Sequence, residues 1–228
     1  GRREQGGKQW LAIVLPVFAG IIFMIVINIS GGYLLRAVVE EKENRTIEIL
    51  ITSVSTTQLM AGKVIGNLSV GLTQLLIWFF LPAVAFIFGQ SFLPFLQEQS
   101  IDRGILGLML LTMLPAFVFI AALMAMIGAT ATESREAQQV AGLFSLPIMI
   151  PFWFVPYLVE YPNSPLSLFL SIFPFSAPIS LPLRAAFSDV PAWQIGLSLG
   201  VLVASALGAV WLAGRAFRLG MLHYGKRL

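Results

Sequence analysis

The chain has 228 residues, of which 57% are hydrophobic and only 11% charged, and its mean hydropathy is +0.87. A soluble domain is about a quarter charged, so this composition excludes an ordinary water-soluble protein and predicts a chain that lies largely in a membrane. The net charge of +3 argues against a nucleic-acid-binding surface, and the absence of cysteine excludes disulfides, thiol catalysis and cysteine-ligated zinc.

The chain begins with a charged run rather than with an apolar leader. Arg2, Arg3, Glu4 and Lys8 lie in the first eight residues, and the first residue is glycine rather than methionine. No secretory signal peptide can be recognised in this run. We therefore expect these residues to be part of a longer protein.

Five segments are long and apolar enough to cross a bilayer as helices, since a span needs about 20 apolar residues. In chain order they are Trp10–Ile29, Leu68–Gly89, Ile105–Ala131, Val140–Leu158 and Trp193–Gly214. Several contain proline, but neighbouring helices in a membrane can satisfy the backbone groups that a proline frees. The sequence predicts an all-α, polytopic membrane helical bundle that forms a single transmembrane domain over residues 1–228.

The Lys and Arg residues between these spans predict the orientation. Nine would lie on one side of the membrane: Arg36, Lys42, Arg45, Lys63, Arg135, Arg215, Arg218, Lys226 and Arg227. The other five would lie on the opposite side: Arg2, Arg3, Lys8, Arg103 and Arg184. Cytoplasmic loops carry the excess of positive charge. We therefore expect residues 36–63 and the C-terminus in the cytoplasm.

Residues 38–50, VVEEKENRTIEIL, are the most polar stretch of the chain and follow the first span. Glu41 and Arg45 are four residues apart in the order that stabilises a helix. With apolar residues between the charges, the pattern predicts an amphipathic helix along the cytoplasmic surface. Both an interfacial helix that rests on lipid and a docking element for a cytoplasmic partner fit this pattern.

Residues 161–187 are too apolar for a loop in water and too rich in proline for a regular span. Nine of the thirteen prolines follow residue 146. Irregular backbone at membrane depth must be buried in protein or line a wet cavity. The pattern favours a re-entrant hairpin at the outer side, and its alternative is a loop that lies on the lipid headgroups.

Small residues recur every four positions in the last span, and this spacing lets membrane helices approach closely. They are Gly196, Gly200, Ala204 and Gly208. We expect this stripe to pack against another helix, either of this chain or of a second subunit.

The residue combinations that catalysis requires are missing. Gly62 and Lys63 do not form an ATP-binding P-loop, because Val64 follows the lysine and no glycine lies five residues before Gly62. The single histidine, His223, cannot form a multi-histidine metal site. No ionisable residue lies well inside a span, which argues against a proton-driven secondary transporter. We therefore expect no catalytic, cofactor-binding or metal-binding residue in this chain.

The stretch VVEEKENRTIEILITSVSTTQLMAGKVIG, residues 38–66, strongly resembles the first cytoplasmic segment of ABC type-2 transporter permeases. The shared pattern is E-E-K-x-x-R, then E-x-L, then a G-K pair before the next span. The closest branch looks like the sodium-export and drug-export permeases. Other stretches that resemble it are GLTQLLIW (71–78), EAQQ (136–139), FPFSAPISLPLR (173–184) and FRLGMLHYGKRL (217–228).

The resemblance covers residues 10–228 and implies a subunit of six spans, of which the first, with its extracellular domain, is absent here. It implies that two such permease subunits, identical or different, pair with two nucleotide-binding ATPase subunits, which hold ATP and magnesium. It implies that the segment matching residues 40–63 meets the ATPase, and that the segment matching residues 162–186 forms short re-entrant helices at the outer face. The implied ATPase-coupling residues are Glu40, Glu41, Lys42, Arg45, Glu48, Leu50 and Lys63. The specific residues of the outer segment are Pro174, Phe175, Pro178, Pro182 and Arg184.

The sequence and the resemblance together predict a permease subunit of an ATP-driven exporter in the cell inner or plasma membrane, not an enzyme itself. Family members move ions, drugs, lipids or polysaccharides, and no motif in this chain identifies the substrate. The alternatives are a membrane assembly or scaffold protein without transport, and a channel or secondary transporter.

Overall fold

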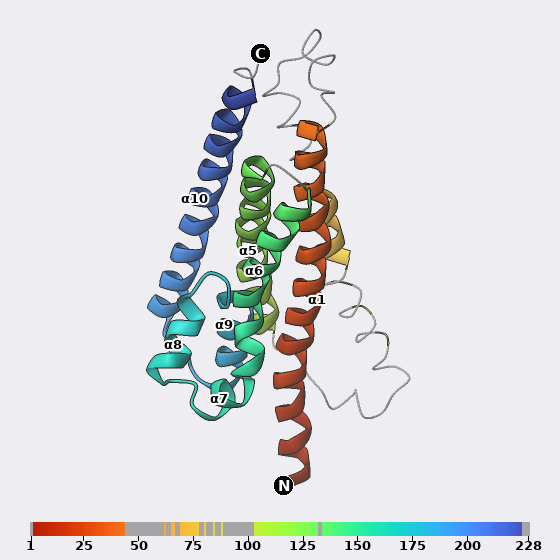
Figure 1. Ribbon diagram of the computed structural model, residues 1–228. Coiled ribbons are helices and arrows are strands. Elements are labelled where there is room, and N and C mark those ends of the chain that lie inside the picture. Colours follow the sequence, from red (N-terminus) through yellow and green to blue (C-terminus); the bar gives the residue numbers. More distant parts are fainter. Residues whose placement is uncertain are drawn as a thin grey trace.

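The computed structural model describes residues 2–43, 103–131 and 134–224, and single positions and short runs between residues 62 and 88. Every secondary-structure element in this part of the chain is a helix. The helices run nearly parallel or antiparallel along one long axis, and a group of short helices closes one end (Figure 1).

The first helix, α1 (Arg2–Glu43), is continuous over 42 residues. Its apolar part, Ile13–Tyr33, is long and apolar enough to cross a membrane and contains the predicted first span from residue 13 onward. The proline inside it, Pro16, does not end the helix. A helix of this length extends well past a single bilayer crossing, since each residue adds about 1.5 Å.

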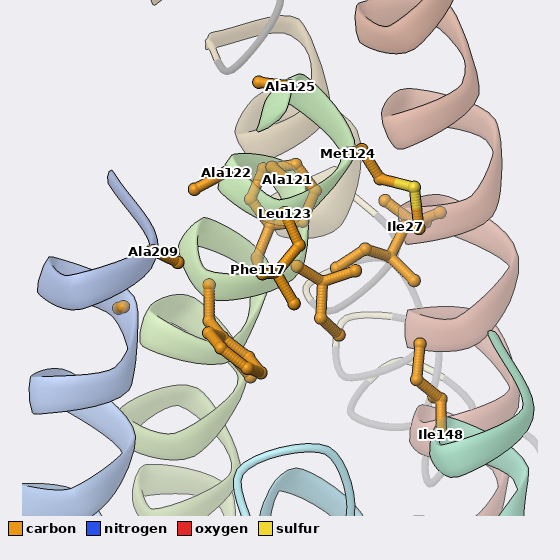
Figure 2. Packing of buried hydrophobic residues seen from close by; sticks show 14 of the residues in the cluster. Ile27, Phe117, Ala121, Ala122, Leu123, Met124, Ala125, Ile148 and Ala209 are labelled. Carbon is orange, nitrogen blue, oxygen red and sulfur yellow. The ribbon is translucent and has the colours of Figure 1, made fainter. Parts of the chain in front are cut away.

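The central helix is α5 (Arg103–Thr130), which contacts both α1 and α10 (Ala192–Tyr224). Two thirds of its apolar span is buried inside the protein. Alanines form much of the α5 surface toward α10 (Figure 2). Their small side chains leave room for neighbouring side chains, so other helices can pack closely against α5. Phe117 and Met124 fill the space toward α1 beside Ile27.

Glycines lie at several close helix contacts, two of which involve the central helix α5. A Cβ atom on Gly31 of α1 would lie 2.9 Å from Cγ of Met124 on α5. A Cβ on Gly71, in the helical residues 69–77, would overlap Ser30 Oγ of α1 and Phe117 Cζ of α5. A side chain at either glycine would force the neighbouring side chains to shift, and residues 69–77 therefore pack directly against α1 and α5.

The predicted span Val140–Leu158 is divided between two helices, α6 (Ser134–Trp153) and α7 (Val155–Glu160). Phe154 interrupts the helix with φ −100° and ψ 7°. Pro156 lacks the backbone N–H that would continue the hydrogen-bond ladder, which explains a break at this point. Pro147 and Pro151 lie inside α6.

Three of the five predicted spans are present as helices long and apolar enough to cross a membrane: Ile13–Tyr33 in α1, Arg103–Thr130 and Ala192–Ala216. The predicted span Leu68–Gly89 lies partly outside the described residues. The count of five spans therefore stays a prediction.

The charged ends of the helices fall on two opposite ends of the molecule. The C-terminal ends of α1 and α10 lie at one end, and the short helices α7, α8 (Pro165–Ile172) and α9 (Ala177–Phe187) lie at the other (Figure 1). Arg36 and Arg215 therefore share one end, while Arg184 lies at the opposite one. These three residues lie as the sequence predicts relative to one another, whereas the cytoplasmic side of the protein stays a prediction.

Candidate functional site

The helix α1 continues without a break from the apolar span into the polar stretch that was predicted to contact a partner. Leu35 and Val39 are fully buried in the main core, whereas Arg36 is exposed. After Gly32 the sequence has no glycine or proline before the end of the helix at Glu43, and it ends in the good helix formers Glu and Lys. Residues 36–43 therefore extend the spanning helix rather than begin a separate surface helix.

Only some of the predicted coupling residues lie in α1. Glu40, Glu41 and Lys42 lie in its last turn. The remaining four lie outside the described residues: Arg45, Glu48, Leu50 and Lys63. Their contact with a partner stays a prediction.

A polar pair that the sequence analysis did not single out joins α1 to α6. The Ser145 hydroxyl lies 2.8 Å from Asn28 Oδ1 and donates to it, while Asn28 Nδ2 donates to the carbonyl oxygen of Met24 at 2.8 Å. Asn28 is exposed and lies about 8 Å from the middle of the span Ile13–Tyr33. An asparagine inside an otherwise apolar span is the sequence signal that could have identified it, since polar side chains at this depth join helices or face water.

The short helices α8 and α9 form a hairpin that packs against α1, α5, α7 and α10. Serine side chains organise its turns. Ser164 caps α8 by accepting from the backbone N–H of Ser167 at 3.2 Å, and Ser176 Oγ donates to the carbonyl oxygen of Leu170 at 2.6 Å. Ser198 of α10 donates to the carbonyl oxygen of Ser171, which ties the hairpin to the last long helix.

The structure brings the predicted residues of the outer segment together in this hairpin. Phe175, in the connection after Pro174, contacts Phe119 of α5 edge-on with ring centroids 5.0 Å apart. Pro178, Pro182 and Arg184 are buried in α9. This segment forms two short helices, α8 and α9. The re-entrant hairpin at the outer side of a membrane stays a prediction.

Arg184 is the largest of the fully buried side chains and is held by neutral acceptors. Its Nε donates to the carbonyl oxygen of Pro162, and its Nη2 donates to Gln194 Oε1 at 2.6 Å and more weakly to Asn163 Oδ1 at 3.4 Å. Burial lowers the pKa of the Arg184 guanidinium, although arginine stays charged in proteins.

The side chain of Tyr161 also has a shifted pKa. A hydrogen bond to the Glu160 carboxylate raises the pKa of the exposed Tyr161.

The small-residue stripe of α10 faces away from the described helices. Cβ atoms on Gly196, Gly200 and Gly208 would meet nothing within 4 Å. The side of α10 that packs on the rest of the protein is the opposite one and consists of Ser198, Leu202, Ala206, Ala209 and Ala213. If the stripe packs against another helix, as predicted, that helix lies outside the described residues, for example in a second subunit.

Two exposed tryptophans frame this stripe. Trp193 and Trp211 are 63% and 58% exposed. They are five helical turns apart, which places them on one face about 27 Å from each other. Arg215 lies over the Trp211 ring, 5.4 Å from its centroid. Tryptophans concentrate at the two membrane interfaces, and this separation matches the hydrocarbon core of about 30 Å.

The described residues contain no group of three or more His, Asp or Glu side chains that could hold a metal ion. The polar side chains described above join helices and cap turns. They do not assemble into a nucleophile with a base.

Comparison with known proteins identifies the family. Residues 9–215 match the family model described as ABC-2 family transporter protein. The chain is 28% identical to the uncharacterized protein MJ1024 of Methanocaldococcus jannaschii, over 97% of this chain and 53% of that protein. It is 24% identical to the uncharacterized protein YhaP of Bacillus subtilis, over 98% of this chain and 54% of that protein.

The chain thus spans about half the length of the curated relatives it matches. No solved structure matches it. The family model covers most of the helices described above, from residue 9 in α1 to Arg215 in α10. The chain therefore belongs to the ABC-2 transporter family.

Proposed function

We propose that this chain is the main membrane part of a permease subunit that exports its substrate with energy from a separate ATPase. Membership of the ABC-2 family makes it a component of membrane transport. The partner ATPase would bind ATP and magnesium. The sequence resemblance to the sodium-export and drug-export branch supports an ion or a small amphiphile as substrate.

The observation that carries this proposal is the continuity of α1. One helix runs from the apolar span to the acidic and basic residues at 40–43, and buried Leu35 and Val39 fix it to the core beyond the span. A force on the charged end is therefore transmitted along a rigid rod rather than absorbed by a loop. In the proposed orientation this end and the C-terminus lie in the cytoplasm, where an ATPase would be found.

The proposed assembly contains two permease subunits and two ATPase subunits. The outward small-residue stripe of α10 supports a contact outside this chain, and the second copy would be identical or a close relative. The complete subunit would have six spans and an outer re-entrant hairpin formed by α8 and α9.

Charge reversal at the end of α1 tests the coupling. We expect Glu41→Arg, and separately Arg45→Glu, to reduce substrate-stimulated ATP hydrolysis at least ten-fold in vesicles, because opposite charges at an interface become like charges. Membrane insertion and yield should stay unchanged. Arg215→Glu is the matched control, since Arg215 lies at the same end of the molecule but contacts Trp211.

The first measurement is co-purification of the full-length protein with an ATPase, followed by transport of a panel of ions and amphiphiles in vesicles. Full transport-linked hydrolysis in both charge-reversal variants would contradict the coupling role. Transport that persists in the absence of ATP would instead indicate a channel or a secondary transporter.

A further inference from the structure

Two buried polar atoms on α9 have no hydrogen-bond partner among the described residues. They are Ser180 Oγ and Arg184 Nη1. Ser180 is fully buried and Arg184 is 2% exposed. An unpaired buried polar group costs free energy comparable to a lost hydrogen bond, and an unpaired buried charge costs more. Two such atoms on one short helix therefore call for a common explanation.

The rest of the Arg184 side chain is already fixed in place. Nε and Nη2 donate to the acceptors described above, which are the Pro162 carbonyl oxygen and the amide oxygens of Asn163 and Gln194. All three acceptors are neutral. The guanidinium is thus oriented by hydrogen bonds, but none of these acceptors balances its charge. A buried cation held in this way is stabilised by an anion.

The two unpaired atoms belong to neighbouring side chains. Residues four apart on a helix lie on the same face, with Cβ atoms about 5–6 Å apart. Ser180 and Arg184 therefore leave α9 from the same face. The hydroxyl of Ser180 can donate one hydrogen bond and Nη1 can donate two. The pair therefore offers donors to one acceptor.

We infer that Ser180 and Arg184 bind a small monatomic anion, such as chloride, inside the α7–α9 end of the molecule. An anion accepts from both donors and also balances the guanidinium charge, whereas a water molecule would do only the first. The burial of both residues excludes a bulky lipid phosphate. The bound anion would link α9, the turn at residues 162–163 and the first turn of α10 through a single side chain.

Anion-dependent stability of the full-length protein in detergent tests this inference. Thermal unfolding is followed in sodium chloride, sodium bromide and sodium gluconate at equal ionic strength. We expect a saturable rise of Tm with chloride and bromide but not with gluconate, because gluconate is too large for a buried site. Ser180→Ala should raise the half-saturating chloride concentration about ten-fold or more, as expected for loss of one hydrogen bond to a charged group.

Two further measurements separate this site from general salt effects and from misfolding. Arg215→Gln removes an exposed cation and should leave the chloride titration unchanged. In a structure determined with bromide, an anomalous peak should lie within 3.5 Å of Ser180 Oγ and disappear in Ser180→Ala. Equal Tm values in chloride and gluconate, or a titration that is identical in Ser180→Ala, would overturn the inference and leave a water molecule as the occupant.

Discussion

At the scale of single residues, Gly71 shows how tightly the helices of this bundle are joined. It is buried, and the space that a side chain would need is occupied by Ser30 of α1 and Phe117 of α5. On the glycines of the α10 stripe, by contrast, an added Cβ would meet no atom within 4 Å. The same small residue therefore brings helices together at one position and leaves a free face at another.

This difference predicts opposite results for two glycine substitutions. Gly71→Val should destabilise the protein by about 1–3 kcal/mol, because the added carbons overlap Ser30 and Phe117 and the packed core must shift. Gly208→Ala should be neutral or slightly stabilising, since alanine favours helix and the position is open. Reversible unfolding in mixed detergent measures both. A Gly71→Val variant as stable as the parent would contradict the close packing.

At the scale of elements, α1 and α9 differ in length and burial but lie in contact with each other. Helix α1 is long, and its charged residues lie beyond its apolar span, whereas α9 is short and its residues Ala177–Arg184 are all buried. The two helices approach closely at Gly20, since a Cβ there would lie 2.8 Å from Ile179 Cγ1. The helix that carries the proposed coupling end is thus in direct contact with the hairpin at the opposite end of the molecule.

A break in α1 beyond its span should prevent movement of the charged end from reaching the rest of the helix. We expect Ala37→Pro to reduce transport-linked ATP hydrolysis in the assembled exporter at least ten-fold, because proline removes a helical hydrogen bond and clashes with the preceding turn. Ala37→Ser keeps the helix and should retain activity. Vesicle transport and ATPase assays on the same preparations measure this, with yield as the control for insertion. Normal coupling in Ala37→Pro would show that continuity of α1 is not required.

At the scale of the whole molecule, the two tryptophans of α10 predict the depth of the protein in a bilayer. A membrane with its interfaces at Trp193 and Trp211 would leave the α8–α9 hairpin near one surface and the C-terminal ends of α1 and α10 beyond the other. Because these residues include no cysteine, single cysteines can be introduced for spin labels. In a single subunit reconstituted alone, so that no second subunit covers the stripe, oxygen accessibility should be highest at Ala204, lower at Gly196, and low at Leu202, which is buried on the opposite face. High accessibility of Leu202 would contradict this placement.

Much of this architecture could be predicted from the sequence, because apolar segments of span length are a strong signal in a membrane protein. The spans in α1, α5 and α10 are of this kind. The Asn28–Ser145 pair and the Arg184 contacts could not be predicted. They join residues 117, 21 and 10 positions apart, and such contacts depend on helix packing that no local pattern specifies. The exposed side of the α10 stripe also required the structure, because small residues suit a helix contact and a lipid-facing surface equally well.

Helix α1 is held at several points along its length. Gly20 and Gly31 bring it close to Ile179 of α9 and Met124 of α5, and these two glycines are about 17 Å apart along the helix. Leu35 and Val39 bury a further turn beyond Gly31 in the core. A displacement of the charged end would therefore move α1 together with α5 and α9, rather than swing α1 past them.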